Sequence, residues 1–200
     1  MGANKQKNLP EIYVQSSVFR ENDVYSPSMD SQQLILDFYP DNITNLIQSL
    51  SNITSAFYGN MLTQVGLKYG TDKIDEISKN TIYALGRATA RRHLAQHDIE
   101  QNAQGITKII IAAVFTANPE YQFEILEFTP DKIAMIVRGI DRYHKIAVAM
   151  GIDKHITWPV VDTFIRAIND EMGLNYTVHL NVKKLDEYSQ CFYDVVIQQE

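Results

Sequence analysis

The side chains best suited to chemistry lie in the segment 138–144, where an apolar, β-rich run over 132–139 gives way to polar residues. Pockets commonly open at the ends of strands, and a histidine can accept or donate a proton near neutral pH. We therefore expect His144 to act as a general acid or base, while Asp141 either orients it or caps the following helix. The residues expected to bind a substrate here are Arg138, Arg142 and Tyr143.

Two further candidate catalytic residues, His179 and Cys191, lie in β-rich runs near the end of the sequence. A thiol acts as a nucleophile when its pKa is lowered and a base lies close to it. His179 can assist Cys191 only if the strand register places both side chains on one face. The alternative interpretation is that Cys191 is a small residue of the core.

Tyr83, Arg87 and Arg91 recur at four-residue spacing in a helical segment, so their side chains project along one line. If this line faces the sheet, the two guanidinium groups form a clamp for a substrate carboxylate. If it faces water, the arginines belong to a solvated helix face. We retain all three as candidate substrate-binding residues.

A metal site is suggested only by His93 and His97, which lie one helical turn apart and have Asp98 beside them. No further ligand is identifiable, and histidines near a helix end interact favourably with its dipole. The single cysteine excludes an intrachain disulfide and any zinc site built on several cysteines. The sequence also lacks G-x-G-x-x-G, P-loop, G-x-S-x-G and H-E-x-x-H motifs. We therefore expect neither a metal nor another cofactor.

Composition and charge narrow the class of protein. The 200 residues are 45% hydrophobic and 21% charged, as is typical of globular proteins. A net charge of −6 argues against a nucleic-acid partner, which would require a basic face. The sequence has no run of about 20 apolar residues that predicts a membrane span, and its first residues lack the apolar core of a secretory signal. A cytoplasmic protein that acts on a small molecule is expected.

Apolar spacing predicts a helical first half. Residues 1–30 are expected to form an arm with little regular structure, and residues 31–200 a single domain. A long helix is expected over 41–69, in which Gly59 is either tolerated or divides the helix in two. Thr71 or Asp72 is the expected N-cap of the next helix, and a third helix follows over 101–117.

In the second half, β-rich runs joined by short polar turns predict two β-hairpins, which are separated by two helices. The expected strands cover 122–129, 132–139, 174–183 and 190–197. The helices between the hairpins are expected over about 141–150 and from an N-cap at Thr157 to Gly173. The fold class is thus α+β, with the helical half packed on an antiparallel sheet whose elements run in the order β-β-α-α-β-β.

Three segments resemble a known family: ALGRATARRHL (Ala84–Leu94), EILEFTPDKIAMIVRGIDRYHK over 124–145, and QCFYDVVI over 190–197. Through these three segments, residues 40–198 resemble the L-2-amino-thiazoline-4-carboxylic acid hydrolase-like family, which is similar to the 4-vinyl-reductase ligand-binding domains. The resemblance implies a mixed fold with a pocket between helices and sheet, and action on, or sensing of, a small amphipathic molecule. Family members often carry a second cysteine, followed by proline, where this chain has Arg138-Gly139, so two-cysteine chemistry is in doubt.

Two hypotheses of function follow. The first is an enzyme that hydrolyses or cyclises a small carboxylate-bearing or heterocyclic metabolite, as in natural-product biosynthesis, by acid/base catalysis through His144 or His179. The second is a non-catalytic small-molecule-binding domain of the 4-vinyl-reductase type, a sensor or carrier. A homodimer through the arm or the helix over 41–69 is compatible with both.

Overall fold

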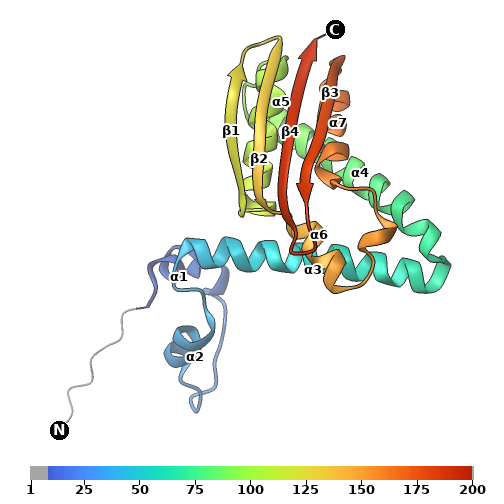
Figure 1. Ribbon diagram of the computed structural model, residues 1–200. Coiled ribbons are helices and arrows are strands. Elements are labelled where there is room, and N and C mark those ends of the chain that lie inside the picture. The colour runs from blue at the N-terminus through green and yellow to red at the C-terminus, as the bar shows by residue number, and fades with distance from the viewer. Residues whose placement is uncertain (1–8, 200) are drawn as a thin grey trace. The chain divides into compact units, whose positions relative to one another are not determined.

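The computed structural model describes residues 9–199, and the chain divides after Leu50 into two compact units. Residues 1–8 of the expected arm lie outside the described residues. The first unit contains α1 (Glu11–Ser16), the 3-10 turn η1 (Ser17–Arg20) and α2 (Ser31–Phe38) (Figure 1). The expected boundary between arm and domain at residue 30 stays a prediction.

The expectation of little regular structure before residue 30 is wrong for α1 and η1. The carbonyl oxygen of Pro10 accepts hydrogen bonds from the N–H groups of Tyr13 and Val14, at 2.9 and 3.2 Å, and Ile12 is buried. Because proline is tolerated at a helix start but not in its interior, Pro10 marks where α1 begins. Further along, the side chain of Asp30 caps α2 by accepting a hydrogen bond from the N–H of Gln33 at 3.0 Å.

Three long helices follow, as the apolar spacing predicts. They are α3 (Ile43–Tyr69), α4 (Ile74–Gln96) and α5 (Ala103–Ala117), with the 3-10 turn η2 (Thr71–Lys73) before α4. Helix α3 continues through Gly59, where an added Cβ would lie only 2.7 Å from the sulfur of Met150. The expected N-cap at Thr71 or Asp72 is wrong, because η2 takes up both residues and the cap of α4 is Lys73.

The second unit also contains a four-stranded antiparallel sheet with the strand order β1-β2-β4-β3 (Figure 1). Its strands are β1 (Tyr121–Phe128), β2 (Lys132–Ile140), β3 (Tyr176–Leu185) and β4 (Gln190–Gln199). Between the two hairpins lie α6 (Arg142–Ala149), the 3-10 turn η3 (Asp153–His155) and α7 (Val160–Glu171). The expected cap at Thr157 is wrong: Pro159 precedes α7, and the N–H of Thr157 instead donates to Asp75 at 2.7 Å.

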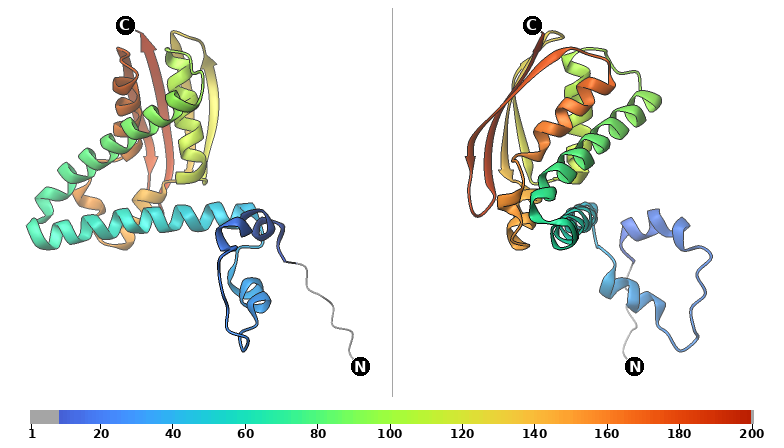
Figure 2. Two further views of the ribbon diagram at one scale, coloured as in Figure 1. Left: turned by 180° about the vertical axis from the view of Figure 1, so that it is seen from behind. Right: turned by 90° about the vertical axis from the view of Figure 1, so that its right-hand side faces the viewer.

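The core lies between one face of the sheet and helices α5 and α7 (Figure 2). Strand β4 shows the expected alternation, because Cys191, Tyr193, Val195 and Ile197 are all buried. Helix α4 packs mainly against α7. The α+β class is therefore confirmed. No helix among the described residues is long and apolar enough to cross a membrane.

Candidate functional site

A small pocket opens between helices α4, α5 and α7, with a cavity volume of about 50 Å³. Most of its wall is apolar and includes Ile82, Leu85, Val114, Val160, Val161 and Phe164. The structure thus forms the pocket mainly from helices. The resemblance implied a pocket between helices and sheet, but the sheet contributes only Tyr121 among the described lining residues.

Gly86 brings two walls of the pocket together where α4 crosses α7. An added Cβ at this position would lie 2.7 Å from the Cβ of Ala167 and 2.8 Å from the carbonyl oxygen of Phe164. Real Cβ atoms do not approach so closely, so this crossing requires glycine on α4 and favours a small residue on α7. The side chain of Phe164 then reaches the pocket.

Asn118 lines the pocket together with two tyrosines, Tyr121 and Tyr143. It ends α5, where its N–H donates to the carbonyl of Val114 at 2.8 Å and its own carbonyl accepts from the N–H of Tyr121 at 3.1 Å. Its side chain lines the pocket and the residue is only 3% exposed. Neither Oδ1 nor Nδ2 has a hydrogen-bond partner among residues 9–199. A buried amide left in this state costs roughly 1–3 kcal/mol, so its presence calls for an explanation.

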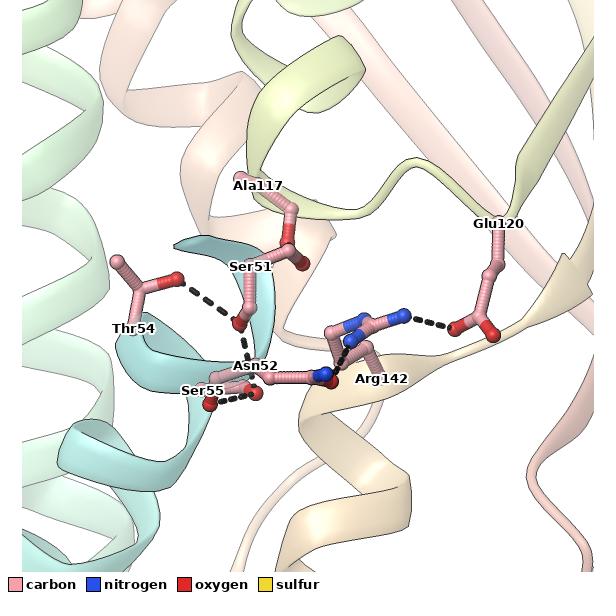
Figure 3. A network of polar contacts seen from close by, with 7 residues as sticks. All are labelled: Ser51, Asn52, Thr54, Ser55, Ala117, Glu120 and Arg142. Atoms are coloured by element: carbon pink, nitrogen blue, oxygen red, sulfur yellow. Dashed lines mark hydrogen bonds and ion pairs between the residues drawn. The ribbon is translucent and has the colours of Figure 1, made fainter. Parts of the chain in front are cut away.

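Two anchors fix the segment that carries Asn118 (Figure 3). Before it, the hydroxyl of Ser51 donates to the carbonyl oxygen of Ala117 at 2.7 Å. After it, Arg142 donates to Glu120 at 2.6 Å and also to the side-chain oxygen of Asn52. The Arg142 side chain is only 6% exposed, so this ion pair is well shielded from solvent. The turn between α5 and β1 is therefore held on both sides of the pocket amide.

A buried carboxylate, Asp141, lies at the junction of β2 and α6. Its Oδ2 accepts hydrogen bonds from the phenols of Tyr121 and Tyr193 at 2.8 and 2.9 Å, and its Oδ1 accepts from the N–H of His144 at 3.0 Å. The residue is fully buried. Burial raises the pKa of both tyrosines well above the ordinary value, so the phenols stay protonated donors. Of the two predicted roles, Asp141 does cap α6.

His144 is buried beside this carboxylate. Its Nδ1 lies 2.8 Å from the hydroxyl of Ser189, and its ring packs edge-to-face on Trp158 with centroids 4.9 Å apart. Burial lowers the pKa of His144, so the ring is neutral at pH 7. His144 is not among the described residues that line the pocket, whereas its neighbour Tyr143 is.

The structure does not bring His179 and Cys191 together. Strand pairing places His179 opposite Val196, and it places Cys191 opposite Gly139 and Leu185. Because alternate residues face opposite sides of a sheet, His179 is exposed on the outer face while Cys191 is buried on the inner one. Burial raises the pKa of the Cys191 thiol to about 12, so the sulfur is not a thiolate at neutral pH.

The line formed by Tyr83, Arg87 and Arg91 on α4 faces α7, and its arginines bind a carboxylate of the same chain. The Nε atoms of Arg87 and Arg91 donate to Glu171 at 2.5 and 2.6 Å, and the phenol of Tyr83 donates to Asp170 at 2.8 Å. Hydrogen bonds from the two arginines lower the pKa of Glu171 to about 2. Both guanidinium groups thus bind Glu171 of α7, and a role in binding a substrate carboxylate stays a prediction.

Arg138 lies on the outer face of the sheet, about half exposed. It pairs with Glu124 at 3.0 Å and lies over the ring of Phe192, 5.0 Å from its centroid. It is thus separated from Tyr143, which lines the pocket. The binding and catalytic roles of the residues chosen from the sequence stay predictions.

No group of three or more potential metal ligands gathers anywhere in residues 9–199. The rings of His93 and His97 lie 5.9 Å apart between centroids, as expected for residues one turn apart on a helix. Comparison with protein-family models, curated proteins and solved structures finds no match for this chain. The site must therefore be interpreted from its own geometry.

The sequence gives no indication that Asn118 lines the pocket. Asn118 ends the helix that is expected over 101–117. One further signal was available: a polar residue one helical turn beyond the apolar run over 109–114 will be buried if the chain turns back onto the sheet. Which residues enclose it depends on the packing of α4 and α7, and local sequence does not report that packing.

Proposed function

We propose that this protein binds a small, mainly apolar molecule in the pocket between α4, α5 and α7. The observation that carries the proposal is a pocket with an almost wholly apolar wall, whose lining residues include Asn118, a buried asparagine with both side-chain polar atoms unpaired among the described residues. A polar group fixed in an apolar wall is the usual composition of a ligand site, where burial supplies affinity and the polar group sets orientation.

Binding has better support than catalysis. The tyrosines Tyr121 and Tyr143 line the pocket, and burial raises the pKa of each, so both phenols stay protonated at neutral pH and cannot accept a proton there. The three expected catalytic residues, His144, His179 and Cys191, are not among its described lining residues. A binding role agrees with one of the two roles that the resemblance implies, the sensing of a small amphipathic molecule. The hydrolase or cyclase stays an untested alternative.

Filling the pocket tests the proposal. Ala113 lines the cavity, whereas its neighbour Ala112 on the same helix is exposed. We expect cyclohexanone, a neutral six-membered ring, to bind the wild-type protein and Ala112→Phe at millimolar concentration, measured by saturation-transfer NMR. Ala113→Phe should abolish this signal, because its ring occupies the cavity.

Circular dichroism and the thermal midpoint must first show that both variants are folded. Unchanged binding of cyclohexanone by folded Ala113→Phe would contradict the proposed site. Absence of binding by the wild-type protein would contradict the proposed function itself.

A further inference from the structure

We propose that α3 carries a docking surface for a second copy of this chain, so that two molecules pair through their α3 helices. The surface is a stripe of apolar side chains that recur along one face of the helix: Ile43, Leu46, Leu50, Ile53 and Phe57. This inference is independent of the ligand pocket, whose described lining residues include none from α3. Three features of α3 support it: which of its side chains are buried, its lack of charge, and the spacing and area of the stripe.

The first feature is that the usual burial pattern of a helix is reversed over residues 51–57. Ser51 and Ser55 are buried, whereas Ile53 and Phe57 are 67% and 72% exposed. A surface helix normally turns its apolar side chains to the core and its polar ones to water. Within the described second unit, the side of α3 turned away from the sheet carries no other element (Figure 2). Large apolar side chains gathered on such a side are typical of an interaction surface.

The second feature is the near absence of charge on α3. Lys68, in the last turn, is the only charged residue among the 27 of this helix. The residues beside the stripe include Ser49, Thr54 and Ala56, which are uncharged. The central parts of protein interfaces are likewise depleted in charged residues and enriched in aromatic ones. Because the whole chain has a net charge of −6, two copies repel each other, and α3 offers a neutral surface through which they can still make contact.

The third feature is the spacing and the area of the stripe. Its five members follow one another at alternating intervals of three and four residues, the pattern by which helices pair side by side. Four of them are at least 50% exposed: Ile43, Leu50, Ile53 and Phe57. Side chains of this size and exposure offer on the order of 500 Å² per copy, whereas stable interfaces bury about 800 Å² per partner. Leu46 and the polar residues beside the stripe can supply the rest. A second copy presents the same spacing, so the two stripes match when they pair about a two-fold axis.

Sedimentation equilibrium of the full chain tests the inference. We expect the wild-type protein at tens of micromolar to have twice the mass of one chain, which is 22.8 kDa. Phe57→Glu should weaken self-association about 100-fold, because each copy then places an unpaired charge in the contact. The matched control is Phe115→Glu on α5, since Phe115 is 64% exposed but lies outside the stripe, and this variant should stay dimeric. Circular dichroism must show that both variants are folded, and Ile53→Glu replaces Phe57→Glu if the latter is not.

Cross-linking then identifies the surface. Leu50 lies at the middle of the stripe, so parallel and antiparallel pairing both bring it next to its counterpart in a second molecule. Leu50→Cys should form disulfide-linked dimers on mild oxidation and Phe115→Cys should not, while the native Cys191 is buried and does not interfere. A dimer that survives both Phe57→Glu and Ile53→Glu, or a folded Leu50→Cys that does not cross-link, would overturn the inference. A monomeric wild-type protein would also overturn it and would mean that the stripe is covered by another part of the same chain or by a different protein.

Discussion

The end of α5 and the junction between β2 and α6 both bury polar side chains, but they satisfy them differently. At the junction, the carboxylate of Asp141 accepts three hydrogen bonds, two of them from tyrosines. At the end of α5, the amide of Asn118 has no partner in the described part of the chain. The two regions meet at Tyr121, which lines the pocket and donates to Asp141.

The two regions differ in whether their buried polar groups find partners within the chain. A fully paired buried network is compatible with a stable core and holds its members in one arrangement. An unpaired amide is unfavourable in a buried position, so Asn118 lowers the stability of the protein in this arrangement. Three predictions test this contrast, each by comparing two buried or paired groups.

The largest effect is expected at Asp141. Asp141→Leu removes the acceptor of Tyr121, Tyr193 and the His144 N–H, leaving three buried donors unpaired. We expect the free energy of unfolding to fall by about 4 kcal/mol, as for other broken buried polar networks. Urea denaturation measures it. Tyr193→Phe, which removes only one of the three bonds, should cost about 1 kcal/mol. Similar losses in both variants would show that the network does not act through Asp141.

A smaller effect is expected when the two arginines on either side of Gly139 are compared. Arg142 is 6% exposed in its side chain and pairs with Glu120, whereas Arg138 is 51% exposed and pairs with Glu124. We expect Arg142→Met to lower the free energy of unfolding by about 2 kcal/mol and Arg138→Met by under about 1 kcal/mol, because solvent weakens exposed ion pairs. Chemical denaturation of both variants measures the two losses in the free energy of unfolding. Equal losses would remove the structural role assigned to the Arg142 anchor.

The smallest effect, and the only change of sign, is expected for two buried asparagines. Asn169 is 7% exposed and its amide pairs with the N–H and carbonyl of Tyr176, at 3.3 and 3.2 Å. Asn118 is 3% exposed and unpaired within residues 9–199. Asn118→Leu should therefore stabilise the ligand-free protein by about 1 kcal/mol, and Asn169→Leu should destabilise it by about 1 kcal/mol. Thermal unfolding shows the direction. Destabilisation by Asn118→Leu would mean that its amide already has a partner.

Periodicity predicted much of the fold. The alternation over Cys191–Ile197 and the apolar spacing in α3 gave the correct elements, because each reports burial on one face of a single segment. Local signals failed where a neighbour decides the outcome. Thr157 is a good capping residue, yet Asp75, 82 positions earlier, engages its N–H instead. In the same way, Thr71 and Asp72 do not cap α4, because both lie within the 3-10 turn η2 that precedes it.

The site was less predictable than the fold for the same reason. The spacing of Tyr83, Arg87 and Arg91 could be seen in the sequence. Their carboxylate partner could not, because the arginines reach Glu171 only through the way α4 crosses α7. The faces of His179 and Cys191 depended on the strand register. Whether the amide of Asn118 finds a hydrogen-bond partner depends on how the surrounding elements pack, so it cannot be predicted from the local sequence.

The position of Cys191 has a practical consequence for labelling this protein. It is the single cysteine of the chain, it is buried, and burial raises the pKa of its thiol to about 12. Alkylating reagents act on the thiolate, so the native protein should be almost inert to maleimides at pH 7. A cysteine introduced at Leu85, which borders the pocket and is 45% exposed, would then carry a fluorophore at one defined place, without any background thiol to remove.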